Sequence, residues 1–188
     1  MSEQRTSRET KHHSLLANEL VVSGQHFVEA MAGLARDQWS FKPAPESWSI
    51  LEAAEHIALV EHGIARLLTT KLAELPLSEE QRVGLKARDA LVTAAMFDRN
   101  TKLTAPERVS PTSRYSDPAE AVAVFEGERA AILAWLAATE LDLRAYGAPH
   151  PRLGLLDGKQ WILFSAAHCA RHTHQIIDLK QHPRYPAF

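Results

Sequence analysis

The segment FSAAHCARHTHQIIDLK, Phe164 to Lys180, gathers three histidines, an arginine and the only cysteine of the chain. The apolar residues around them recur with the period of an α-helix. Each helical residue advances about 100° around the axis, so His168 and His172 lie about 40° apart in the middle of the apolar face. His174 falls on the opposite, polar side. Two of the three histidines are therefore predicted to face the protein interior.

The spacing of the inward pair indicates a metal site. Side chains four positions apart on a helix lie one above the other, so H-x-x-x-H can direct two imidazole nitrogens at one ion, as in the zinc-binding helix of metalloproteases. Cys169 stands where those enzymes carry a catalytic glutamate, which argues against a metalloprotease. Catalytic zinc sites usually take three protein ligands. A third ligand must therefore come from another segment.

His56, within WSILEAAEHIALVEHGI, is the best candidate for the third ligand. Its neighbours at helical spacing are apolar, so it borders the apolar face of its own helix. His62 lies about 240° away, on the polar side of the same helix. Spacing alone leaves a second interpretation open, in which hydrogen-bonded core histidines carry no metal, because buried imidazoles need partners for their nitrogens.

Other reactive side chains near these histidines have simpler interpretations. Cys169 flanks the apolar face and is interpreted as a small packing residue. His150, in APHPRLG, precedes the last helix and is interpreted as a turn residue, although it could reach the mouth of a pocket. Glu52 is taken up by a helix cap, and Glu55 points to another side of its helix. No general base is therefore evident beside the histidines.

Long helical patterns dominate the rest of the chain, and their ends carry recognisable signals. Ser49 followed by Glu52 forms a capping box, and Asp117, Pro118 and Glu120 mark another helix start. The segment 98–117 has no periodicity, and a connector of that length is either functional or a tolerated surface loop. The patterns neither predict nor exclude short strands in the connectors. The patterns predict an all-α four-helix bundle with long helices at about 8–35, 49–75, 117–139 and 160–181, a weaker helix at 78–97, and long irregular connectors.

Composition limits the class of protein. The chain has 188 residues with 45% hydrophobic and 23% charged residues, which suits one domain over 1–188 with its core at about 8–182. A net charge of −2 gives no basic surface for nucleic acid. No apolar run is long enough for a membrane span, and from the polar N-terminus no signal peptide is expected. With a single cysteine, the chain is expected to be cytoplasmic.

Taken together, the motifs resemble the DinB/YfiT-like metalloenzyme family. The resemblance rests on Trp48–Ser49 at a helix start, on His56, and on a final-helix H-x-x-R-H-x-x-Q-I pattern that spans His168 to Ile176. The order and spacing of the helices agree over nearly the whole chain. Arg171 and Gln175 match motif positions to which the family assigns no firm role. Both are expected to be structural, although Gln175 points inward and could support a ligand.

The resemblance implies a fold, a site and a reaction class. The fold would be an up-down-down-up bundle, and His56, His168 and His172 would bind a divalent metal, usually zinc or nickel. Relatives with known activities transfer or isomerise small molecules with low-molecular-weight thiols such as bacillithiol or mycothiol. The leading hypothesis is therefore a metal-dependent thiol S-transferase acting on a small-molecule substrate. The alternatives are a metal-dependent hydrolase and a non-catalytic, stress-associated binding protein, and relatives are often homodimers.

Overall fold

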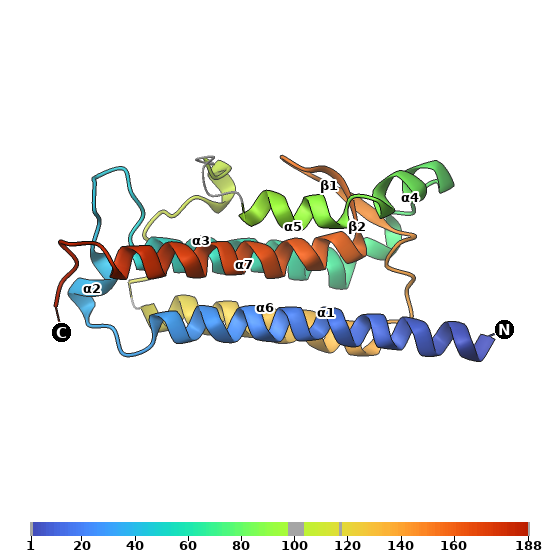
Figure 1. Cartoon of the computed structure of the whole chain (residues 1–188), viewed down its shortest axis with the longest axis horizontal. Helices are drawn as coiled ribbons and strands as arrows, with labels where there is room; N and C mark the ends of the chain where they lie inside the picture. The colour runs from blue at the N-terminus through green and yellow to red at the C-terminus, as the bar shows by residue number, and fades with distance from the viewer. Residues whose placement is uncertain (1, 98–103, 117, 188) are drawn as a thin grey trace.

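A computed structural model describes residues 2–97, 104–116 and 118–187 (Figure 1). Most of the described chain is helical, with one small sheet. The α-helices are α1 Ser2–Met31, α2 Arg36–Ser40, α3 Ile50–Arg66, α4 Glu79–Lys86, α5 Asp89–Phe97, α6 Pro118–Ala138 and α7 Gly158–Lys180. A π-helical turn η1 (Leu67–Lys71) and two 3₁₀ turns, η2 (Leu72–Glu74) and η3 (Glu107–Val109), complete the helical elements, and the sheet pairs β1 Gly147–His150 with β2 Gly154–Asp157.

The four longest helices lie alongside one another. In Figure 1, α1 and α7 run in one direction along the molecule, and α3 and α6 run in the other. α1 packs on α7 and α6, and α3 packs on the same two helices. None of the described helices is long and apolar enough to cross a membrane. This packing brings α3 and α7, which carry the candidate histidines, into direct contact.

Both of these helices begin with a capping box at their N-terminus. In the N-cap of α3, Glu52 N–H donates to Ser49 Oγ and Ser49 N–H donates to Glu52 Oε2, which confirms the predicted capping box. α3 ends at Arg66, earlier than predicted, but η1 and η2 continue the helical path to Glu74. α7 is capped in the same way by Asp157 and Gln160. The two caps therefore fix where α3 and α7 begin.

A β-hairpin lies immediately before α7, in a connector for which the sequence neither predicted nor excluded strands. β1 and β2 are antiparallel, with Gly147 opposite Asp157 and His150 opposite Gly154. Gly154 has a φ of +71°, a conformation that glycine adopts without steric cost. Gly158 then passes close to Leu72, where an added Cβ would stand 2.8 Å from a leucine methyl carbon. The hairpin holds His150 beside the first turns of α7.

Three other predictions differ from the structure. The first helix starts at Ser2 and ends at Met31, so it does not reach residue 35. The loop after it contains α2, whose Gln38 side chain accepts a hydrogen bond from Ala35 N–H and so stabilises a short helical segment. The connector 98–117 contains η3. Residues 98–103 and the predicted cap Asp117 lie outside the described residues, while α6 does begin at Pro118.

The buried apolar side chains form two clusters along the length of the helices. One is centred on Leu20, Leu68 and Ile162, and the other on Phe27, Phe125 and Ile176. Apolar packing on both sides fixes the positions of α3 and α7. It also leaves little freedom to the polar side chains that these two helices present to each other.

Candidate metal centre

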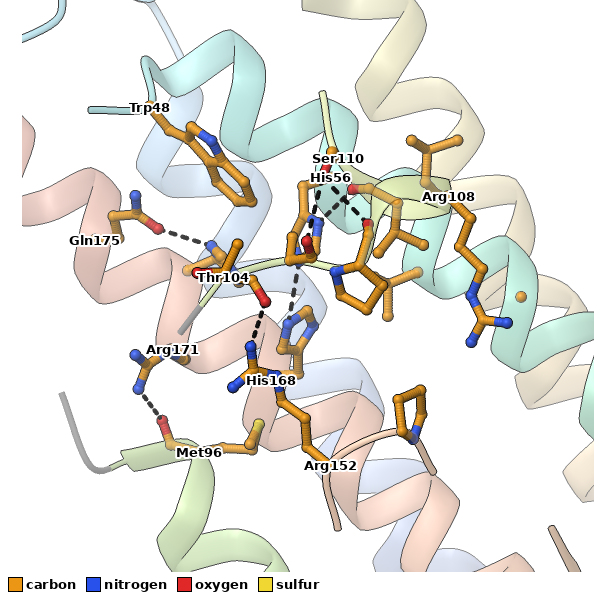
Figure 2. Close-up of a pocket in the computed structure, with 18 of the residues that line it drawn as sticks. Trp48, His56, Met96, Thr104, Arg108, Ser110, Arg152, His168, Arg171 and Gln175 are labelled. Carbon is orange, nitrogen blue, oxygen red and sulfur yellow. Dashed lines mark hydrogen bonds between the residues drawn. The ribbon is translucent and has the colours of Figure 1, made fainter. Parts of the chain in front are cut away.

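Three histidines meet between α3 and α7 (Figure 2). His56 comes from α3, and His168 and His172 come from successive turns of α7. One ring nitrogen from each lies within 4.8 Å of the others. His56 and His172 are buried, at 4% and 6% exposure, and His168 is partly buried. The three residues singled out by their spacing therefore converge on one point, across 112 positions of sequence between His56 and His168.

A backbone carbonyl fixes the protonation state of His56. Its Nδ1 lies 2.7 Å from the carbonyl oxygen of Val109, which can only accept a hydrogen bond. Nδ1 therefore carries the hydrogen, and Nε2 presents a lone pair toward the other histidines. Val109 belongs to η3, in the connector between α5 and α6. This contact could not be found from side-chain patterns, because it is made by a main-chain atom.

Gln175 plays the same part for His172. Its Oε1 lies 2.8 Å from His172 Nδ1, one helical turn away on α7. If Oε1 accepts the Nδ1 hydrogen, Nε2 of His172 also presents a lone pair to the centre. This contact agrees with the interpretation that Gln175 supports a candidate ligand, and it does not exclude a purely structural role. Gln175 orients the imidazole so that its Nε2 faces the other two histidines.

The distance between His56 and His168 fits a shared ion. Their Nε2 atoms are 3.3 Å apart. Two nitrogens bound tetrahedrally to one zinc ion at about 2.0–2.1 Å would lie about 3.3–3.4 Å apart. Without a metal, His168 must donate its own Nε2 hydrogen to His56, because His56 Nε2 has none. The donor set of three neutral imidazoles thus matches what zinc and nickel accept.

Burial keeps the three rings uncharged. Burial is the largest cause in each case, and it lowers the pKa of all three histidines. Repulsion from His172 and His56 adds to the lowering at His168, whose pKa lies well below its usual range. The pKa of His172 falls to about 3, and the hydrogen bond to Val109 opposes part of the lowering at His56. Neutral imidazole is the form that binds metal.

Aromatic side chains surround the histidines. The ring of Trp48 lies 4.8 Å from that of His56 and stacks at 18° on His172, with 6.1 Å between centroids. Phe164 stacks on His168, with centroids 5.1 Å apart. These rings cover part of the imidazole surfaces with apolar atoms, which weakens dielectric screening there. Trp48 entered the sequence analysis only as part of a helix-start motif, and its contact with two histidines depends on the fold.

The connector 104–116, here called the strap, is tied to α3 beside the histidines. The buried carboxylate of Glu55 accepts hydrogen bonds from Thr112 N–H at 2.8 Å and from Arg114 N–H at 3.2 Å. The next residue, His56, donates to Val109 of the same strap. As predicted, Glu55 points away from the metal centre. It fixes the segment whose carbonyl orients His56, which gives the long connector a structural role at the site.

The centre opens into a large cavity of about 1150 Å³. The strap, α3, α7 and the β-hairpin all contribute to its walls. Trp161, Phe164 and Trp48 supply apolar surface, and His150 lies on the same wall, with its ring centroid 4.4 Å from that of Phe164. A cavity of this size admits a drug-sized molecule to the histidines.

The other reactive residues lie away from the centre, largely as expected. His174 is exposed, and the exposed His62 pairs with Glu128 at 2.7 Å at the edge of the cavity. Cys169 is 1% exposed, its thiol approaches the carbonyl of Ser23, and burial raises its pKa to about 12. The prediction that Cys169 is a packing residue is confirmed.

Two residues have contacts that the sequence did not specify. Arg171 donates to the carbonyl oxygen of Met96 at 3.0 Å, so it links α7 to the last turns of α5. His150 is the last residue of β1, so it precedes the turn, and its Nδ1 accepts from Arg152 and Leu153 N–H in that turn. Its ring lines the cavity, as the second interpretation of His150 expected.

The fold is mainly helical, and its three grouped histidines could hold a metal ion. Comparison with known sequences gives the family. The family model of the DinB superfamily matches residues 19–176, and the chain belongs to this superfamily. It is also 24% identical over 151 residues to the uncharacterised protein YuaE of Bacillus subtilis (strain 168), a match that covers 80% of this chain and 88% of YuaE. No solved structure matches the chain.

Proposed function

We propose that this protein is a divalent-metal-dependent enzyme in which His56, His168 and His172 hold the ion, with zinc or nickel as the best-fitting metals. The proposal is carried by one observation: three neutral imidazoles converge, and the Nδ1 atoms of two of them are held by Val109 and Gln175. We further propose that the four long helices form an up-down-down-up bundle, which is the arrangement expected in this superfamily.

The reaction that the site supports best is transfer of a low-molecular-weight thiol to a small substrate. When bound, a divalent ion supplies a positive charge that lowers the pKa of a nearby thiol or water molecule. The residues of this chain bind and orient: the imidazoles stay neutral, Trp48 and Phe164 cover part of the ring surfaces, and the cavity admits the substrate. A thiol has an ordinary pKa of about 8.5, so it gives up its proton to solvent with little help.

The two carboxylates of α3 nearest His56 in sequence on its N-terminal side, Glu52 and Glu55, favour thiol transfer over hydrolysis. Activation of water commonly uses a general base within hydrogen-bonding reach. Glu55 is fully buried and spends both oxygens on the strap, and Glu52 caps α3 while pairing with Lys42. Neither is available to take a proton from a water molecule at the histidines. A hydrolase and a non-catalytic binding protein are the outcomes that would replace this proposal.

The metal site is tested on protein purified without a polyhistidine tag. We expect about one equivalent of zinc or nickel per chain by elemental analysis, and loss of that metal in His56→Ala, His168→Ala and His172→Ala. His174→Ala is the matched control, because it removes an exposed histidine of the same helix. Unchanged metal content in the three inward variants would show that the site is wrong.

The reaction is tested separately on the metal-loaded protein. It is incubated with an electrophilic substrate panel and with bacillithiol, mycothiol, glutathione or cysteine, and thiol conjugates are measured by mass spectrometry. We expect conjugation with at least one thiol, and its loss in His168→Ala. Metal binding without any thiol turnover would contradict the transferase and leave a metal-binding protein, whereas turnover of esters or amides without thiol would identify a hydrolase.

A further inference from the structure

The two ring nitrogens of His150 have different surroundings. Its Nδ1 accepts hydrogen bonds from the main-chain N–H groups of Arg152 at 3.2 Å and Leu153 at 3.1 Å, in the turn of the β-hairpin. Within residues 2–97, 104–116 and 118–187, no group forms a hydrogen bond with its Nε2. Nε2 is also not enclosed, because the buried side-chain polar atom without a partner in these ranges is the Tyr185 hydroxyl. Since His150 lines the cavity, its Nε2 is accessible to a ligand there.

The turn fixes which nitrogen of His150 carries the hydrogen. Main-chain N–H groups can only donate, so Nδ1 must present its lone pair and cannot carry a hydrogen itself. Burial, together with the positive charges of Arg108 and Arg152, lowers the pKa of His150 to about 4, so the ring is neutral near pH 7. A neutral imidazole with no hydrogen on Nδ1 carries it on Nε2. His150 therefore provides a hydrogen-bond donor at the cavity wall.

The ring of His150 lies one aromatic side chain away from the histidine centre. Phe164 contacts both, with its ring centroid 4.4 Å from that of His150 and 5.1 Å from that of His168. Arg152, from the same turn, donates to the carbonyl oxygen of Thr104, and its guanidinium lies beside His168 (Figure 2). The turn and the centre thus adjoin the same part of the cavity, so one molecule can contact both.

The other rings beside His150 are apolar or have no donor left. Trp161 and Phe164 are both buried, and the ring centroid of Trp161 lies 5.3 Å from that of His150. Trp161 Nε1 donates to the carbonyl oxygen of Ala148 at 3.2 Å, which uses the only donor of the indole. Among these three rings, His150 is therefore the one that offers a ligand a hydrogen bond, next to aromatic surface.

We propose that His150 donates a hydrogen bond from Nε2 to a carbonyl oxygen of the substrate, whose apolar or aromatic body lies against Trp161 and Phe164. The reacting end of that substrate then lies at the three histidines. This proposal rests on the proposed function, because it takes the substrate to occupy this cavity, and it specifies the substrate class. A neutral N–H donor matches an uncharged carbonyl oxygen, which can only accept, whereas a hydrocarbon of similar shape leaves the donor without a partner.

The first measurement determines the tautomer of His150. Heteronuclear NMR of the ring nitrogens in the metal-free protein, with the His150 signals identified by their absence from His150→Asn, should show a hydrogen on Nε2 and none on Nδ1 at pH 7. This readout uses the wild type, so it does not depend on how well a variant folds. A hydrogen on Nδ1 would overturn the proposal.

The second measurement compares acetophenone with ethylbenzene, which has a methylene group in place of the carbonyl. Both are bound to metal-free protein by equilibrium dialysis. His150→Asn keeps an oxygen that can accept from the turn but has no group at the place of Nε2. We expect the affinity for acetophenone, relative to ethylbenzene, to fall about fivefold in this variant. The infrared carbonyl stretch of bound, isotope-labelled acetophenone should lie at lower frequency in the wild type than in the variant.

His182→Asn is the matched control. His182 also lines the cavity and also accepts a main-chain N–H through Nδ1, from Arg184 at 3.2 Å, but it lies beyond the C-terminus of α7. This variant should bind both probes as the wild type does.

Three outcomes of the binding measurement would overturn the proposal: no binding of acetophenone to the wild type, an unchanged affinity ratio in His150→Asn, or an equal loss in His182→Asn. Because both measurements use metal-free protein, they can fail while the tests of metal content and thiol transfer succeed, and the reverse. The failure of this proposal is therefore distinguishable from that of the proposed function.

Discussion

The helices α3 and α7 carry two buried polar clusters, which differ in whether their polar atoms are all bonded to one another. One is the cluster of the three histidines, and the other is formed by Glu61 and Ser165 together with Arg129. Glu61 lies little more than a turn beyond His56 on α3, and Ser165 lies about a turn before His168 on α7. Both oxygens of the Glu61 carboxylate are engaged, by Arg129 at 2.6 and 3.2 Å and by the Ser165 hydroxyl at 3.2 and 3.0 Å. Glu61, Arg129 and Ser165 do not line the large cavity.

The histidine cluster is built in the opposite way. His56 and His172 use one ring nitrogen each to contact the protein and turn the other toward a shared point, and that point opens to the cavity. Burial and polarity are common to both clusters. A closed set of hydrogen bonds stabilises the fold, whereas ring nitrogens that face a shared point beside a cavity provide a site for a ligand. The following predictions test this distinction.

The largest expected effect is at the cluster of Glu61, Arg129 and Ser165. Arg129→Ala leaves the Glu61 carboxylate buried without its ion-pair partner, so we expect the free energy of unfolding to fall by about 3–5 kcal/mol. Urea denaturation of the metal-free protein measures this loss. The double variant Glu61→Leu with Arg129→Met should recover most of it, because no unpaired charge remains. A cost below about 1 kcal/mol for Arg129→Ala would contradict a structural role for this pair.

The next effect is the pH dependence of stability that the histidine cluster causes. His172 has a folded-state pKa of about 3 against an ordinary value near 6.5, so below pH 6.5 the unfolded chain takes up a proton that the folded protein excludes. Stability therefore falls as pH falls, by about 2 kcal/mol for this histidine between pH 7 and pH 5. Urea denaturation with a chelator present should show this loss in the wild type and a smaller loss in His172→Gln.

The exposed His174 supplies the control for that experiment. It lies on the same helix, so His174→Gln should leave the pH dependence of stability as it is in the wild type. Equal pH dependence in wild type and His172→Gln would show that His172 is not held neutral by burial.

A smaller effect is expected from the residue that orients His172. Gln175→Leu removes the acceptor for Nδ1, and we expect zinc affinity to fall about 10–100-fold in competition with a chromophoric chelator. Gln175→Glu keeps an acceptor oxygen and should retain most of the affinity. Gln25→Leu, at an exposed position of α1, is the matched control. Unchanged affinity in Gln175→Leu would mean that packing alone orients the ring.

The smallest effect is expected at Cys169. Its thiol is buried with a pKa of about 12, so the folded protein should resist iodoacetamide at pH 8 and become reactive in urea. Cys169→Ala should cost about 1 kcal/mol of stability through lost packing and leave metal content unchanged. Rapid labelling of the folded protein, or loss of metal in the variant, would show that Cys169 belongs to the histidine cluster and not to the core.

Some features of the site follow from local sequence because they depend only on helical geometry. The inward direction of His168 and His172, the outward direction of His174 and the cap formed by Ser49 and Glu52 were all predictable on this basis. Each is set by residues within a few turns of one helix, where spacing fixes direction. The mostly helical class followed in the same way from apolar periodicity.

Other features needed contacts between distant segments. The Val109 carbonyl is a main-chain group, so no side-chain pattern points to it. The cavity-lining residues Arg108 and Arg152 come from a connector and a hairpin whose paths no periodic pattern describes. The sequence pointed to Gln175 as facing inward but not to its contact with His172, because that choice depends on the rotamers of both residues.

By itself, the sequence determined which faces of α3 and α7 are apolar and which histidines lie on them, because side-chain period is a local property of a helix. Only the tertiary structure decided that those faces meet with His56 opposite His168, because the register between two helices is set by packing along their whole length. The strap and the hairpin then decided what surrounds the centre. The strap is tied to α3 by hydrogen bonds between distant residues, such as those to Glu55, that no local pattern encodes.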